Sequence, residues 1–382
     1  MAKSNPQPDV LVLGQHPCAY LAACIMLEKP GVTVAHATIP GDTPPDRLVI
    51  INPQLFALHK PLEKIKKKLE LTPVYGAMFL SEDAATRGEW CSKTVVAYIG
   101  CYSDIRKQLA ALAKEAGAKC HAPKSLNVTH VHERGFEVSV DSHHVQPKAV
   151  LLAGNVSAEQ GKMLGLPDDF HRDVMRRYSF VRLRGTEKWT APINGGKLTL
   201  PMSLDLSGKL TWAWMLPGVD EIQLAVEQPL DDIERNPPQK LIEKWVGILR
   251  KHGCMKADAP TVKTDSMESI DFPAAGALAR EIIANRTLLF GPAGGFYTAS
   301  LEDLYPNCWS AVFAVEAIRE AIKEPHLQDA LQPYRQKWGT TLGEYLRGPQ
   351  QNLRFLLPLV YRNPTMTRLM AESILQGKPV VR

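Results

Sequence analysis

The first apolar run of the chain covers residues 9–13 and meets Gly14, after which residues 19–29 are rich in Ala, Leu, Ile and Met. A short buried strand that ends in a glycine and leads into a small-residue helix is how a nucleotide-binding βαβ unit begins. A Pro-Gly pair then stops the helix, and residues 31–37 supply a second apolar run. The opening therefore predicts the first half of a nucleotide-binding domain.

Hydrophobic periodicity predicts further elements along the next part of the chain. Residues 47–53 are extended, and helical patterns cover residues 55–71 and 101–117. Alternating runs between residues 126 and 140 lead into a buried strand at 149–154 that ends in glycine. This order predicts a small antiparallel flap inserted into a parallel sheet.

Alternation returns between residues 178 and 227, where we predict a second, antiparallel sheet. The strand-to-glycine form of the opening recurs at 286–291, and a loop and a long helix over 309–323 follow it. The tail after Pro333 mixes apolar bulk with arginines, so it could rest on a lipid surface, cover a cavity or pack on the body of the protein. Its helical composition is interrupted at Gly348-Pro349, Pro358 and Pro364.

The composition is that of a packed globular chain. Its 382 residues are 45% hydrophobic, which is enough for two cores. The net charge of +5 could favour an anionic ligand or a membrane surface but is too small to indicate nucleic acid, so we expect no nucleic-acid partner. The seven cysteines lack CxxC spacing, which disfavours structural zinc or a disulfide framework. With no signal peptide and no apolar run of bilayer length, we expect a cytoplasmic protein and leave peripheral membrane contact open.

Four short motifs follow one another in a fixed order. The first is the opening βαβ unit with Pro17 in its loop, and the second is residues 103–109, a helix that carries Arg106. The third and fourth, residues 150–155 and 288–295, are strands that run into Ala-Gly-Asn and Gly-Pro-Ala-Gly-Gly. In this order they resemble the flavoprotein family that includes aromatic-ring hydroxylases, geranylgeranyl reductases and flavin-dependent halogenases, with Pro17 and Arg106 at that family's proline and arginine positions.

The resemblance covers nearly the whole chain and implies an α/β fold. This is a Rossmann-like FAD/NAD(P)-binding fold with an inserted antiparallel β-sheet substrate domain and a helical C-terminal tail. The strands around 212–217 look like the substrate sheet of the geranylgeranyl-reductase branch, which implies an apolar substrate, isoprenoid or lipid. The predicted domains are residues 1–75 with 100–170 and 276–330 for the FAD-type dinucleotide-binding domain, 76–99 with 171–275 for the substrate domain, and 331–382 for the tail.

The cofactor that the resemblance implies is FAD. Glycines of the two flavin loops could contact it through their backbone, and Arg47 and Arg106 could contact the flavin or another anion, or be surface ion-pair partners. The positions that would form this site are Gly14, His16, Pro17, Ala19, Thr38, Arg47, Arg106, Gly291, Pro292, Gly294 and Gly295.

Several of these positions depart from the family's pattern. His16 replaces the second glycine of the loop and puts an imidazole where a phosphate would lie; it could fill vacated space or, when protonated, bind the phosphate. Thr38 stands where an acid should hold the adenosine ribose, and Pro292 replaces the aspartate that grips the ribityl chain. The turn that offers amides to the flavin ring is expected as a loop at 304–308. Each lost hydrogen bond to a charged ligand costs about 1.5–3 kcal/mol.

A second set of residues could form a substrate pocket. Trp212 and Trp214 are two positions apart and therefore share one face of their strand, where they could form a wall for a flat or greasy ligand or belong to the ordinary core. Phe296 and Tyr297, just after the glycine loop, could cap the same cavity. The chain has no Gly-x-Ser-x-Gly elbow, and the sequence identifies neither a catalytic acid or base nor a metal site.

These observations leave two principal functions open. The first is an FAD-dependent oxidoreductase in which the cofactor supplies the chemistry and the protein supplies a dry pocket. The second is a flavin-free descendant of the same scaffold that binds a hydrophobic small molecule or a partner protein. A third, weaker alternative keeps a nucleotide but no flavin, with His16 on its phosphate.

Overall fold

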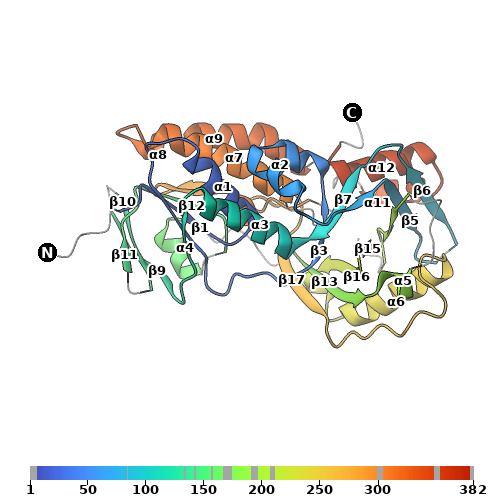
Figure 1. Ribbon diagram of the computed structural model, residues 1–382. Helices are drawn as coiled ribbons and strands as arrows, with labels where there is room; N and C mark the ends of the chain where they lie inside the picture. Colours follow the sequence, from blue (N-terminus) through green and yellow to red (C-terminus); the bar gives the residue numbers. More distant parts are fainter. Residues whose placement is uncertain are drawn as a thin grey trace.

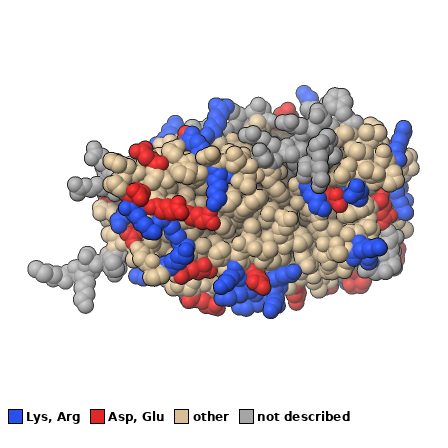
Figure 2. Space-filling model, turned by 90° about the horizontal axis from the view of Figure 1, so that it is seen from above, with Lys and Arg blue, Asp and Glu red and all other residues tan. Residues whose placement is uncertain are grey.

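The structure is a computed structural model, and it places a helix-covered, mainly parallel sheet at one end of the molecule and a large, mainly antiparallel sheet at the other (Figure 1). Figure 2 shows basic and acidic side chains interspersed over the upper face, with uncharged surface between them. None of the described helices has the length and apolarity that crossing a bilayer requires. The residues described are 7–83, 85–132, 135–141, 143–155, 158–166, 174–190, 197–206, 211–298, 304–347 and 353–378.

A six-stranded sheet in the order β18-β19-β12-β1-β2-β8 forms the centre of the half that the sequence predicts as a dinucleotide-binding domain, named here the nucleotide-binding half after that prediction. All its neighbouring strands are parallel except β18 and β19. Every residue of β1 and β12 is buried because helices cover the sheet, which explains the continuous apolar runs of the sequence. The strands are β1 (Val10–Leu13), β2 (Val34–Ala37), β8 (Lys119–His121), β12 (Ala149–Leu152), β18 (Ile283–Ala284) and β19 (Thr287–Leu289).

Three helices fix the ligand-facing edge of this sheet. Helix α1 (Pro17–Leu27) follows β1 directly and packs against α3 (Tyr102–Glu115) and α7 (Leu304–Ala321). A 3₁₀ turn, η5 (Gly291–Gly294), follows β19 and contacts α7. The strand-glycine-helix order of the sequence therefore brings the first and fourth motifs to the same edge.

Two small antiparallel sheets are attached to this half. The predicted flap is β9 (Leu126–His132), β10 (Gly135–Val140) and β11 (His143–Val145). A second sheet has the order β3-β7-β4 and lies between the two large sheets (Figure 1). Its strands are β3 (Leu48–Ile51), β4 (Thr72–Val74) and β7 (Ala97–Cys101).

The predicted second sheet is confirmed and has seven strands in the order β17-β13-β16-β15-β14-β5-β6. Its pairings are antiparallel except for β14 with β5. One face packs on α6 (Pro238–Lys251), and the other packs toward the nucleotide-binding half. The strands are β5 (Gly76–Leu80), β6 (Arg87–Cys91), β13 (Met175–Arg184), β14 (Thr199–Ser203), β15 (Trp212–Pro217), β16 (Glu221–Pro229) and β17 (Glu268–Pro273).

The C-terminal tail packs on the body of the protein. Helix α12 (Pro364–Gln376) contacts β5 and β6, and Met370 and Ile374 are buried in the same hydrophobic cluster as the inner face of the large sheet. Earlier tail helices contact α7. The other helices from residue 327 onward are α8 (Leu327–Ala330), α9 (Gln332–Lys337), the π-helix η6 (Trp338–Leu342), α10 (Gly343–Arg347) and α11 (Leu353–Val360). Short helices elsewhere are α4 (Ala158–Met163), α5 (Thr186–Trp189) and η4 (Leu230–Asp232).

Three predicted boundaries are wrong. The helix expected over 55–71 is divided into η1 (Pro53–Ala57) and α2 (Lys60–Lys66), because His59 is extended and Pro61 lies in the first turn of the new helix. Helix α7 begins at Leu304, so residues 304–308 are helical and not a loop; Pro306 is tolerated because the first turn needs no N–H partner there. Pro358 lies inside α11 and does not end it.

Candidate ligand-binding site

A side chain closes the N-terminus of α1. His16 is the N-cap residue, and the Cys18 backbone N–H donates a hydrogen bond to His16 Nδ1 at 3.2 Å. In a dinucleotide-binding loop, the N–H groups at this end of the helix face the pyrophosphate. His16, only 6% exposed, supplies the acceptor that a phosphate would otherwise supply. Because Nδ1 accepts, the ring that forms this cap is neutral and carries its proton on Nε2. The arrangement matches the alternative in which His16 fills the vacated space.

The loop after β2 is tied to the same turn. Gln15 Nε2 donates to the Ile39 carbonyl at 3.1 Å, and the Ile39 N–H donates to Gln15 Oε1 at 2.9 Å. Gln15 Nε2 also reaches Thr43 Oγ1 at 3.4 Å. The Thr38 N–H donates a hydrogen bond to the His121 carbonyl at 3.0 Å. These bonds draw the loop across the carboxyl ends of β1 and β2, where this fold places an adenosine ribose.

A half-buried carboxylate, that of Asp42, joins this loop to the end of β12. The Asn155 backbone N–H donates to Asp42 Oδ2 and its side-chain Nδ2 donates to Asp42 Oδ1, both at 3.1 Å. The approach requires a glycine at 154, since a Cβ there would lie 2.4 Å from Asp42 Oδ2. Burial raises the pKa of Asp42 from its usual 3.8 to about 6. At neutral pH an ionised Asp42 repels a phosphate brought to this edge.

The glycine amides that were expected to contact a cofactor donate to the protein itself. The Gly14 N–H bonds to the last carbonyl of β2 at 2.9 Å, and the Gly295 N–H bonds to the Pro292 carbonyl at 3.0 Å. The Gly291 N–H donates to Ser310 Oγ at 2.9 Å, and that hydroxyl donates in turn to a carbonyl within α7. Three of the four glycine positions predicted as backbone contacts therefore use their N–H groups internally.

A cavity of about 210 Å³ lies where these elements meet the large sheet. Its wall includes His16, Asp42 and Asn155, which lie at the ends of β1, β2 and β12 described above. Arg47 and Tyr102 line the wall beside them. The glycine loop contributes Pro292 and Tyr297, and β17 contributes Ile270 and Asp271. Pockets for drug-sized ligands measure about 300–1,000 Å³. The cavity is thus smaller than the site of a drug-sized molecule, and FAD is larger still.

Arg47 places a buried positive charge in this wall. The side chain is 3% exposed, and its guanidinium carbon lies 4.2 Å from the centre of the Tyr102 ring. A guanidinium over an aromatic face gains a cation–π interaction and stays planar, which suits it to a flat anionic ligand. The nearby carboxylate of Asp271 is bonded by Arg177 through Nε and Nη2 at 2.6 and 2.7 Å, which neutralises it.

The structure brings only some of the predicted site residues together. Thr38 and Arg106, which is half-buried on α3, do not line the cavity. Ala19 is fully buried in the contact between α1 and the sheet, and Pro17 occupies the first turn of that helix. The predicted residues that do line the cavity are His16, Arg47, Pro292 and Tyr297.

Trp212 and Trp214 lie on one face of β15, as the spacing predicts, and their rings stack with centres 5.7 Å apart. They are 4% and 1% exposed and pack with Tyr178 in the hydrophobic cluster between the sheet and the nucleotide-binding half. Phe296 is fully buried against Trp338. None of these rings lines the 210 Å³ cavity, so their role as a substrate wall stays a prediction.

Sequence reasoning missed four residues that shape the cavity: Gln15, Asp42, Tyr102 and Asn155. Gln15 itself carries no signal, because it occupies a variable position of the Gly-x-Gly-x-x-Gly pattern. Nothing in the local pattern around Asp42 marks it, since its partner is 113 positions away. In the described part of the chain, His, Cys, Asp and Glu side chains form no group of three or more that could hold a metal ion.

Comparison with known proteins defines the class of fold. A geranylgeranyl bacteriochlorophyll reductase-like protein from Thermoplasma acidophilum is 15% identical with a TM-score of 0.69, over 97% of this chain and 92% of that protein. The flavin-dependent brominase Bmp2 is 14% identical with a TM-score of 0.68, over 97% and 94%. P. aeruginosa PqsL in complex with 2-aminobenzoylacetate is 13% identical with a TM-score of 0.66, over 97% and 99%.

Neither a family model nor a curated protein sequence matches the chain. The chain nevertheless has the fold of flavin-dependent oxidoreductases and halogenases, which confirms at the level of fold the resemblance drawn from its four motifs.

The residues present do not fit the flavin dinucleotide that this fold implies. His16 caps the helix that would hold the pyrophosphate, and Gln15 and Asp42 bridge the edge that would hold the adenosine ribose. The Gly291 amide is bonded to Ser310, and Pro292 has no N–H to donate. The cavity lined by described residues at this edge is about 210 Å³.

Proposed function

We propose that this chain is a flavin-free member of the flavoprotein fold that binds a small aromatic acid in the cavity beside Arg47. The observation that carries the proposal is the cap of α1 by His16, because it places a protein acceptor on an N–H group that a cofactor phosphate needs. The proposal assigns no redox step to the protein.

The volume of the cavity sets the size of the ligand. An engineered cavity of about 150 Å³ is enough to bind benzene. A cavity of about 210 Å³ therefore holds one aromatic ring with one or two substituents, but not a dinucleotide. Tyr297, Pro292 and Ile270 supply apolar wall for such a ring.

The charge of the wall sets the chemistry of the ligand. Arg47 is buried and can form a charge-assisted, bidentate pair with a carboxylate. Asp271 is compensated by Arg177, whereas Asp42 is bonded only by the neutral Asn155 and keeps its charge at neutral pH, so the carboxylate of the ligand points toward Arg47 and away from Asp42. PqsL, whose fold this chain shares, is known in complex with 2-aminobenzoylacetate, itself a one-ring acid.

The test is titration calorimetry of the full chain with benzoate and with benzamide, its uncharged analogue. We expect benzoate to bind at least about tenfold more tightly, since one charge-assisted hydrogen bond contributes about 1.5–3 kcal/mol. Equal affinity for the two probes, or binding of neither, contradicts the proposal.

A second candidate function is an FAD-dependent oxidoreductase acting on an apolar substrate. Its support is the shared fold, which extends over 97% of this chain and 94% of a flavin-dependent brominase. FAD binding would require the bonds of Gln15, His16 and Asp42 to open, and each net bond lost costs about 0.5–1.5 kcal/mol. Stoichiometric uptake of FAD by the full chain would favour this candidate over the first.

A further inference from the structure

We infer that Gln223 and Arg182, two residues of the large sheet, are positioning residues that hold Arg47 in the cavity and so set the preference for an anionic ligand. The inference rests on the proposed function and deepens it. Arg47 belongs to a short segment, residues 46–48, that enters β3. This segment separates the cavity from an open groove of about 670 Å³ lined by Asp46, Arg182 and Glu221.

Gln223 fixes the segment on the C-terminal side of Arg47. The Leu48 N–H donates to Gln223 Oε1 at 2.8 Å, and Gln223 Nε2 donates to the Leu48 carbonyl at 3.0 Å. Nε2 also donates to the hydroxyl of Tyr178 at 2.9 Å. Gln223 is fully buried, so water cannot replace these bonds at low cost. A side chain of β16 thus pairs with β3 in the way that a neighbouring strand would.

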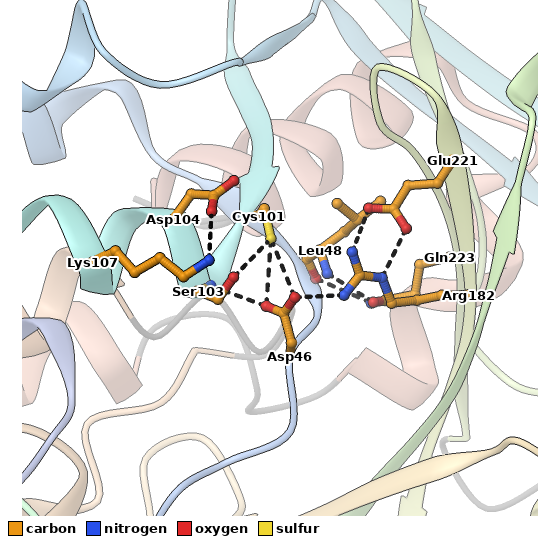
Figure 3. Close-up of polar contacts among 9 residues, drawn as sticks. All are labelled: Asp46, Leu48, Cys101, Ser103, Asp104, Lys107, Arg182, Glu221 and Gln223. Atoms are coloured by element: carbon orange, nitrogen blue, oxygen red, sulfur yellow. Dashed lines mark hydrogen bonds and ion pairs between the residues drawn. The ribbon is translucent and has the colours of Figure 1, made fainter.

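Arg182 fixes the segment on the N-terminal side. Its Nη1 donates to Asp46 Oδ2 at 2.7 Å, and its Nε donates to Glu221 Oε2 at 2.8 Å, so one guanidinium joins the segment to β16 (Figure 3). Asp46 in turn accepts the Ser103 N–H at 3.0 Å. The planar fork of an arginine holds both carboxylates in a fixed geometry.

The first turn of α3 holds Arg47 itself. The Tyr102 N–H donates to the Arg47 carbonyl at 2.9 Å, and the ring of the same tyrosine lies under the guanidinium. The backbone on either side of Arg47 is therefore held by the large sheet, while its carbonyl and side chain are held by α3. A charged group fixed in this way needs little reorganisation when a carboxylate arrives.

The test measures the ratio of benzamide Kd to benzoate Kd in variants of the full chain. We expect Gln223→Leu to lower this ratio about tenfold and Arg182→Met to lower it about threefold, because a misplaced guanidinium loses directional bonding to the carboxylate while the apolar wall still binds the ring. Arg182→Lys keeps a cation beside Asp46 and recovers part of the ratio. A ratio that is unchanged in Gln223→Leu contradicts the inference.

Trp245→Phe is the matched control. Trp245 packs on the opposite face of the same sheet, where its Nε1–H donates to the Trp214 carbonyl at 3.1 Å. This variant destabilises the sheet without touching residues 46–48, so its ratio stays within about twofold of the wild type. A drop as large as that of Gln223→Leu would show that general loosening, not positioning, sets the preference.

A second measurement needs no ligand and separates the inference from the proposed function. Hydrogen exchange at the Leu48 and Tyr102 amides reports directly whether the segment is held. We expect about tenfold faster exchange at both amides in Gln223→Leu and none of this change in Trp245→Phe. If wild-type protein fails to distinguish benzoate from benzamide, the proposed function fails, and the exchange data alone then decide whether Gln223 holds the segment that carries Arg47.

Discussion

The two ends of the ligand-facing edge of the nucleotide sheet are built from the same kind of strand, yet one is filled and the other is open. At the carboxyl ends of β1 and β2, Gln15, His16 and Asp42 bond to the protein's own backbone and side chains. Toward η5 and β3, a cavity of about 210 Å³ remains around Arg47. The difference between the two ends is that polar side chains occupy one with intramolecular hydrogen bonds and leave a cavity at the other, and our proposal places a small ligand in that cavity.

The filled end gains stability from the bonds that would otherwise belong to a ligand. An uncapped helix start leaves N–H groups for water or a phosphate to satisfy, whereas a side-chain cap is worth about 1 kcal/mol in the free protein. Side-chain hydrogen bonds at this end therefore stabilise the chain without a ligand. The same bonds would have to break before a phosphate could bind there, which would weaken its binding. At the open end, the buried Arg47 guanidinium packs over the Tyr102 ring, 4.2 Å from its centre.

The largest expected effect is at the open end. Replacement of Arg47 by Met should weaken benzoate binding about 100-fold and leave benzamide binding within a few fold, because the variant removes the charged partner and keeps apolar bulk. Calorimetry with both probes measures the difference.

Arg106→Met is the matched control for Arg47→Met. Arg106 is half-buried on α3 and does not line the cavity, so its replacement should leave both affinities unchanged. Equal losses in the two variants would mean that net charge, rather than a localised site, attracts the anion.

The next effect concerns pH and the filled end. Burial lowers the pKa of His36 from 6.5 to about 4 and raises that of Asp42 from 3.8 to about 6. Between pH 4 and 6.5 the His36 side chain binds more protons in the unfolded state than in the folded state. Its contribution to the free energy of unfolding is therefore fully present above about pH 6.5 and is lost as the pH falls toward about 4. For Asp42 the folded state binds more protons, so stability falls as the pH rises from about 4 to 6.

The two contributions are opposite in sign and each amounts to at most about 3 kcal/mol. In the wild type these two contributions therefore largely offset each other between about pH 4 and 6, and each variant is compared with the wild-type slope. Asp42→Asn should make stability rise with pH across this window, and His36→Gln, which can still donate to the Gly14 carbonyl, should make it fall. Urea unfolding at a series of pH values measures both slopes, and parallel curves for all three proteins would refute the assignment.

The smallest effect tests the cap itself. His16→Ala should lower the free energy of unfolding by about 1 kcal/mol, and His16→Asn should restore most of it, because Asn is a good N-cap residue. Chemical unfolding measures the two changes. Equal stability of His16→Ala and wild type would mean that His16 does not cap α1 and leaves the phosphate position free.

The sequence was enough to predict the sheets but not the state of the site. Buried apolar runs such as β1 and β12, and alternation such as β15, follow directly from which faces are covered. The departures at His16 and Pro292 were also visible, because a dinucleotide loop restricts the side chains it can accept. The hydrophobic pattern and the departures from the loop motif both depend on neighbouring residues in the sequence, so the sequence alone reveals them.

What replaced the lost contacts could not be read locally. Asp42 meets Asn155 across 113 positions, and Leu48 meets Gln223 across 175, so only the folded chain reveals the pairs. Helix α7 begins five residues before its predicted start, because the loop expected at 304–308 followed from the family resemblance and the first turn of a helix tolerates Pro306.

The most direct measurement is the uptake of FAD by the full chain. Purified protein is incubated with excess FAD, freed of unbound cofactor by gel filtration, and examined for absorbance near the flavin band and for a change in melting temperature. We predict colourless protein whose melting temperature does not change with FAD and does rise with benzoate. One equivalent of bound flavin, with a melting temperature that rises with FAD concentration, would contradict the claim that the protein's own side chains have taken the cofactor's place.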